Sequence, residues 1–106
     1  MTDQVRHYIK ITTNLPDDQI VRLADIARRN LAEILANAEQ ALQEKDYSAL
    51  GHDAHKLKGI LLQCGLADLA EKAQEIHTNT KDPEDFLFAK ALDAIKNDIG
   101  QFIEGL

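Results

Sequence analysis

Apolar residues recur at intervals of three or four positions in five segments of the chain, and this spacing predicts five helices. The first is short, about residues 3–12, with Val5, Tyr8, Ile9 and Thr12 on one side. The second runs from Pro16, which suits a first helical position, to about Glu44. It is expected to bury one stripe of apolar side chains, made of Ile20, Leu23, Ala27, Leu31, Ile34, Leu35, Ala38 and Leu42.

Capping residues place the third and fourth helices. Asp46 is a predicted N-cap for a third helix that runs to Cys64, where Gly65 provides a stop. A fourth helix is expected at about residues 66–79. These two helices, joined at Gly65, should form an antiparallel hairpin.

The last helix is predicted to begin with Asp82 as N-cap and Pro83 as its first residue. Its core positions would be Phe88, Ala91, Leu92, Ile95, Ile99, Phe102 and Ile103. No segment shows the alternation of a strand. Four long amphipathic helices with short loops favour an all-α fold, an antiparallel four-helix bundle in which the short N-terminal helix covers one end. No linker or repeat divides residues 1–106, so a single domain is expected.

Composition narrows the possible partners. The chain has 106 residues, 44% of them hydrophobic and 28% charged, as in an ordinary soluble domain. A net charge of −6 argues against binding to nucleic acid or to an anionic membrane surface. The sequence contains no apolar run long enough for a signal peptide or a membrane span. We therefore expect a cytoplasmic, free-standing monomer.

The segment GHDAHKLKG, residues 51–59, is unusual because it carries two glycines inside a predicted helix. Glycine costs a helix interior about 1 kcal/mol relative to alanine. Gly51 lies four residues before His55 and Gly59 four residues after it, so all three share one row on the helix surface. The prediction is that both glycines leave the His55 imidazole standing on bare backbone, open to an approaching partner.

Two further side chains are predicted to act with His55. Lys58 lies one turn later, is expected to be exposed, and should lean back over the turn that holds His55. Its ammonium would keep the imidazole neutral and could pair with a phosphoryl group on the ring. His77 follows Gly65 by twelve positions, whereas His55 precedes it by ten, so the two should face each other. A hydrogen bond from His77 could then fix which nitrogen of His55 is free.

His55, Leu57, Lys58, Gly59 and Gly65 resemble the signature of the histidine-containing phosphotransfer (HPt) domain. The resemblance covers about residues 54–77 and implies a four-helix bundle that accepts a phosphoryl group on His55. The donor and the acceptor would be receiver-domain aspartates, of response regulators or of a hybrid sensor histidine kinase. It also implies no ATP binding, no kinase activity and no cofactor, because the receiver brings the Mg²⁺.

A docking surface for the receiver is expected around His55. Its predicted members are Gly51, Gly59, His52, Lys56, Leu62 and Gln63. The sequence departs from the family pattern at two places. Bulky Ile60, Leu61 and Leu62 follow Gly59 where small residues are frequent, which places one of them near the surface. His77 stands where the family often has Gln or another polar residue.

Two other functions compete with the relay. His52, His55 and His77 could converge to bind a metal ion, with Asp53 or water as the fourth ligand. Lys58 beside a dication argues against this, and the glycines would have no role in it. The second alternative is a helical adaptor without chemistry, in which His55 could be replaced with no loss of function.

Overall fold

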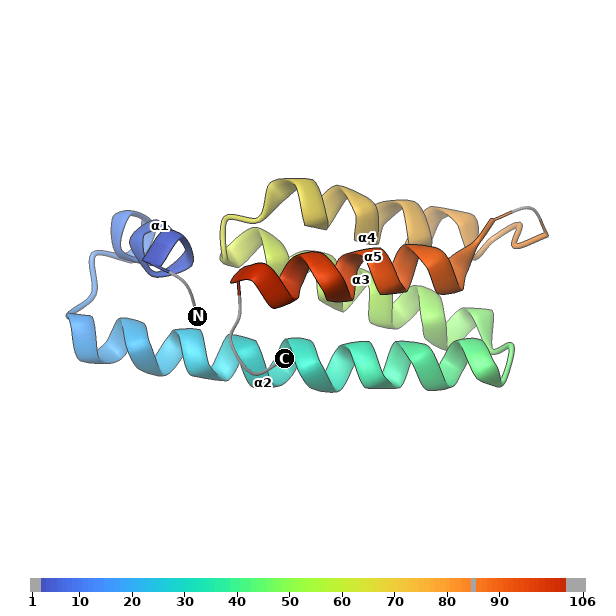
Figure 1. Cartoon of the computed structure of the whole chain (residues 1–106), viewed down its shortest axis with the longest axis horizontal. Coiled ribbons are helices and arrows are strands. Elements are labelled where there is room, and N and C mark those ends of the chain that lie inside the picture. Colours follow the sequence, from blue (N-terminus) through green and yellow to red (C-terminus); the bar gives the residue numbers. More distant parts are fainter. Residues whose placement is uncertain (1–2, 85, 103–106) are drawn as a thin grey trace.

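The computed structural model describes residues 3–84 and 86–102. Five helices account for most of this part of the chain: α1 (Asp3–Thr13), α2 (Asp17–Gln43), α3 (Tyr47–Gln63), α4 (Ala67–Asn79) and α5 (Phe88–Phe102). Helices α2 to α5 form an antiparallel bundle, and α1 lies across the N-terminal end of α2 (Figure 1). The predicted fold class, an all-α bundle with a short additional N-terminal helix, is confirmed.

Helix α3 occupies a central place, because it packs against both α2 and α4, while α5 closes the bundle against α4 and α2. The N-cap predicted for α3 is present: the Asp46 carboxylate accepts a hydrogen bond from the Ala49 backbone N–H at 3.1 Å. Leu50, Leu57 and Leu61 are fully buried along one side of this helix. Burying each such side chain stabilises the fold by about 1.5–3 kcal/mol, so α3 is held rigidly and its opposite side is free to carry a site.

The core stripe of α2 differs in part from the prediction. Leu23 is 40% exposed, whereas the small residues Ala24 and Ala41 are buried. Alanine allows neighbouring helices to approach closely, and the buried side of α2 includes these alanine positions. Leu23 therefore faces a surface groove instead of the bundle interior.

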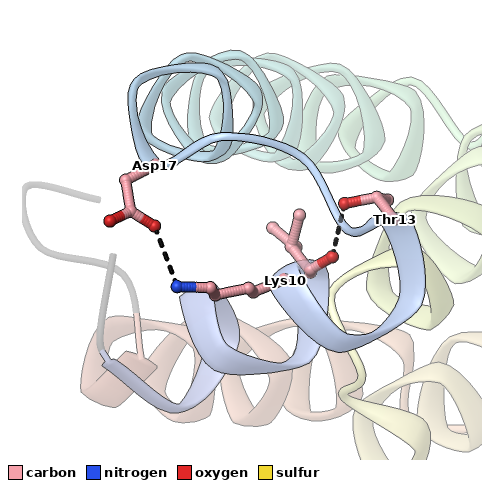
Figure 2. Close-up of polar contacts among 4 residues, drawn as sticks. Lys10, Thr13 and Asp17 are labelled. Atoms are coloured by element: carbon pink, nitrogen blue, oxygen red, sulfur yellow. Dashed lines mark hydrogen bonds and ion pairs between the residues drawn. The ribbon is translucent and has the colours of Figure 1, made fainter.

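Helix α1 is anchored by its buried side chains Val5 and Ile9, by one aromatic contact and by one ion pair to α2. Gly65 has a φ of +75°, and a Cβ built on it would lie 2.5 Å from the Tyr8 ring, so the ring packs directly on this turn. Lys10 Nζ lies 3.2 Å from Asp17 Oδ1, and the Thr13 hydroxyl donates to the Ile9 carbonyl at 2.6 Å (Figure 2). Tyr8 is 39% exposed because it covers the turn from outside.

The start of α5 was predicted wrongly. Asp82 and Pro83 lie in the connection after α4, and the helix begins at Phe88. Phe88 is the first buried residue of this segment, and its ring lies 5.5 Å from that of Tyr47. The helix thus begins at the first residue of this segment whose side chain is buried. The predicted core contacts of Phe102 and Ile103 lie outside the described side chains.

None of the helices in the described part of the chain is long and apolar enough to cross a membrane.

Candidate functional site

The imidazole of His55 is exposed on α3, on the side of the helix away from its buried leucines. The ring of His77 from α4 lies beside it, with ring centroids 5.6 Å apart and planes tilted by 46°. The predicted pairing of the two histidines across the hairpin is therefore present. Both rings line an open depression between α3 and the end of α4, together with Tyr47, Ser48, Gly51, His52, Thr80 and Lys81.

The predicted hydrogen bond between the two imidazoles is not formed. His77 Nδ1 lies 2.8 Å from the carbonyl oxygen of Gly51. A carbonyl only accepts, so Nδ1 carries a proton and donates it. This bond spans α3 and α4 and fixes the His77 ring. His77 is thus held beside His55 by a hydrogen bond to the backbone of α3. The carbonyl that accepts this bond belongs to Gly51, which lies one helical turn before His55.

Lys58 is half-buried between α3 and α4, so the expectation that it is exposed is wrong. Its ammonium donates to Gln74 Oε1 at 2.9 Å, and the Gln74 amide donates in turn to the Thr78 hydroxyl at 3.1 Å. The long side chain gains a fixed position from this bond. An ammonium has three donors, and the contact with Gln74 uses one, which leaves two for an anion on the neighbouring turn.

The two glycines have different surroundings. Gly59 is exposed, and a Cβ added there would meet nothing within 4 Å. Gly51 is buried, and a Cβ added there would lie 2.7 Å from Thr80 Oγ1 and 3.6 Å from His77 Nδ1. The prediction of bare backbone on both sides of His55 is therefore right for Gly59 and wrong for Gly51.

A second depression lies on the α2 side of α3. Four of its lining residues, Asp53, Lys56, Gly59 and Gln63, lie within eight positions of His55 in the sequence. Burial raises the pKa of the Asp53 carboxyl, and the nearby Lys56 and His52 oppose this shift. Of the predicted docking residues, His52, Lys56, Leu62 and Gln63 are exposed, as expected.

The sequence analysis missed an apolar groove that adjoins this second depression. It is lined from α1 by Tyr8, from α2 by Leu23 and Ile26, and from α3 by Ile60 and Gln63. Ile26 is 47% exposed, and Leu62 on α3 is 46% exposed. Leu23 had been assigned to the core from periodicity alone, which cannot distinguish a buried stripe from the edge of a groove.

The sequence analysis also missed Gln74 and Thr80, although a signal for Gln74 exists. Lys58 precedes Gly65 by seven positions and Gln74 follows it by nine, the same offset that pairs His55 with His77. Residues of α4 that lie two positions farther from Gly65 than a residue of α3 thus face that residue, and this spacing predicts Gln74 as the partner of Lys58. No comparable signal distinguishes Thr80 from the other polar residues at the end of α4.

The other candidate chemistry finds little support. Within residues 3–84 and 86–102, no three His, Cys, Asp or Glu side chains are grouped so as to hold a metal ion. Cys64 is 2% exposed and lies in the core, and burial raises the pKa of its thiol to about 11. A thiol in this state is a poor nucleophile.

Comparison with known proteins agrees with this geometry. The family model of the Hpt domain matches residues 22–105. The chain therefore belongs to the Hpt domain family. Membership implies phosphotransfer in two-component signalling, as a phosphocarrier instead of a kinase, with receiver or kinase proteins as partners. Searches of curated proteins and of solved structures found no matching relative.

Proposed function

We propose that this protein is a phosphorelay intermediate, which accepts a phosphoryl group on His55 from a receiver-domain aspartate and passes it to another. The observation that carries the proposal is the exposed imidazole of His55, beside the open surface at Gly59, in a chain of the Hpt domain family. Neither ring nitrogen of His55 has a hydrogen-bond partner among the described residues, so a nitrogen lone pair is available to attack phosphorus.

In the proposed transfer, a neutral His55 nitrogen attacks the acyl phosphate of the receiver in line with the departing oxygen. The P–N bond forms, the P–O bond breaks, and the aspartate leaves as a carboxylate with the bonding electrons. Lys58, held by Gln74, supplies a positive charge one turn from the ring. The chain itself would need no cofactor, and the receiver would supply the Mg²⁺.

The docking face of the receiver would extend from His55 past Gly59 to the apolar groove. Lys56 and Lys58 give this side of an acidic protein two local positive charges, which suit the acidic pocket of a receiver. Leu62 and the groove residue Ile26 add exposed apolar surface next to them. Gly51 would not contact the receiver, because Thr80 and His77 cover it.

The test is transfer from phosphorylated receivers encoded in the same genome. We expect an acid-labile, alkali-stable phosphoryl group on the wild-type protein. His55→Gln should abolish labelling, whereas His52→Gln, which changes a second imidazole of the same depression, should retain most of it. Label retained by the His55 variant would overturn the assignment. Full signalling function of that variant would instead favour a helical adaptor.

A further inference from the structure

His77 has one ring nitrogen engaged and one free. Nδ1 donates to the Gly51 carbonyl at 2.8 Å, and Nε2 has no hydrogen-bond partner among residues 3–84 and 86–102. The ring lines the same open depression as His55, with 5.6 Å between the two centroids. A proton can therefore be added to Nε2 from solvent without breaking the bond to Gly51, which turns the ring into a donor on both sides.

We propose that His77 takes up a proton when His55 is phosphorylated, and that the imidazolium then binds a phosphoryl oxygen and lengthens the lifetime of the phosphohistidine. The inference rests on the proposed function and adds to it a positioning residue that responds to pH. In the coupled reaction, the phosphoryl group bonds to a His55 nitrogen as its bond to the receiver aspartate breaks, and the aspartate leaves as a carboxylate. Solvent supplies the proton that binds His77 Nε2. No oxidant or further reactant is required.

The charges around the depression support this coupling. Helix α3 presents Tyr47, His52 and His55, and Lys81 follows α4. None of the residues that line it is a carboxylate, so before phosphorylation a proton on His77 has no counter-ion there. On α4 itself, Glu75 is exposed two positions away, and one turn earlier Gln74 binds Lys58. A phosphoryl group on His55 would bring the first negative charge into the depression, and opposite charges at this range favour the protonated ring.

Binding of a phosphoryl group and binding of a proton must then strengthen each other reciprocally. The ratio of phosphoryl lifetimes in wild type and in His77→Gln should therefore depend on pH. Glutamine keeps an N–H for the Gly51 carbonyl but cannot gain a proton. We expect the phosphoryl lifetime of the wild type to be about three- to tenfold longer than that of the variant near pH 6, and the ratio to approach one near pH 8. His7→Gln, which removes an exposed histidine of α1 that does not line the depression, is the matched control and should keep the wild-type lifetime at each pH.

A direct measurement uses NMR of the wild-type protein before and after phosphorylation, with phosphoramidate or a phosphorylated receiver as donor. At neutral pH the His77 ring signals should move toward those of an imidazolium once phosphorus NMR shows phosphohistidine. Phosphohistidine at His55 with unmoved His77 signals would overturn this inference and leave the proposed function intact. If no donor labels His55, the proposed function fails and this inference fails with it.

Discussion

Gly51 and Gly59 lie on α3 one turn before and one turn after His55, yet they differ in burial and in the atoms that surround them. Gly59 faces open space, whereas Gly51 is pressed against Thr80 and carries the carbonyl that binds His77. Glycine at position 51 thus allows close approach of α4, and glycine at position 59 leaves the surface clear. A single residue type serves packing on one side of the histidine and, in our proposal, access on the other.

This difference gives His55 one closed side and one open side. On the closed side, α4 supplies His77 and fixes its orientation through the Gly51 carbonyl. On the open side, the exposed surface continues from Gly59 toward Gln63 and the apolar groove. A receiver would therefore approach over Gly59, and the two sides can be tested separately by substitution.

The largest effects are expected from glutamine at each glycine, and they should fall on different properties. Gly59→Gln should keep or slightly raise stability and slow phosphotransfer at least about 100-fold, because the new side chain holds the receiver away from the ring. Gly51→Gln should lower the free energy of unfolding by about 1–3 kcal/mol, because the side chain overpacks the contact with Thr80. Thermal melts and transfer rates measured on both variants show whether each glycine is needed for stability or for transfer.

If Gly59→Gln folds and transfers at the wild-type rate, the open side is not the docking side. If Gly51→Gln is as stable as wild type, the contact with Thr80 is not the reason for glycine at that position.

Lys58 provides the next largest effect. We expect Lys58→Ala to slow transfer by about 10- to 100-fold, which corresponds to a lost charge-assisted contact of about 1.5–3 kcal/mol. The matched control is Lys56→Ala, which removes an exposed lysine two positions away and should change the rate far less. Transfer rates should be compared at low and high salt. Equal rates for the two variants would mean that Lys58 acts only through the general charge of the surface.

The fold could be predicted from sequence because helix periodicity, caps and the Gly65 turn all indicate the same arrangement. The prediction failed where local signals compete with burial. Asp82 and Pro83 form a good helix start in isolation, but the first residue of this segment with a buried side chain is Phe88. Similarly, Leu23 fits the periodic stripe of α2, but the neighbouring alanines allow closer packing and take the buried positions.

The residues that face each other across the α3–α4 hairpin could be predicted from their distances to the turn at Gly65. The distances from Gly65 place His77 beside His55, and the same rule places Gln74 beside Lys58. Hydrogen-bond partners could not be predicted in this way, because both the His55 ring and the Gly51 carbonyl lie close to the His77 ring. The burial of Gly51 depends on Thr80, which lies just beyond α4, where helix periodicity no longer indicates what a residue faces.

The smallest effects, from alanine at the same two positions, separate packing from helix propensity. Gly59→Ala should raise the free energy of unfolding by up to about 1 kcal/mol, because the position is helical and open. Gly51→Ala should show no such gain. Its Cβ would lie 2.7 Å from Thr80 Oγ1, so this hydroxyl would have to leave the His77 carbonyl oxygen, to which it donates at 2.6 Å.

A double-mutant cycle isolates this contact. In a Thr80→Ala background the oxygen is gone, and the remaining neighbours of a Cβ at position 51 are at ordinary contact distances, 3.5 Å to Thr80 Cβ and 3.6 Å to His77 Nδ1. Gly51→Ala should then stabilise the protein nearly as much as Gly59→Ala does, whereas Gly59→Ala should have the same effect in both backgrounds because its site is distant and empty. The six proteins are wild type, Gly51→Ala and Gly59→Ala, each with and without Thr80→Ala. Chemical denaturation measures the free energy of unfolding of each one. A gain from Gly51→Ala that is the same with and without Thr80 would mean that the two glycines differ in surroundings but not in what a side chain there costs.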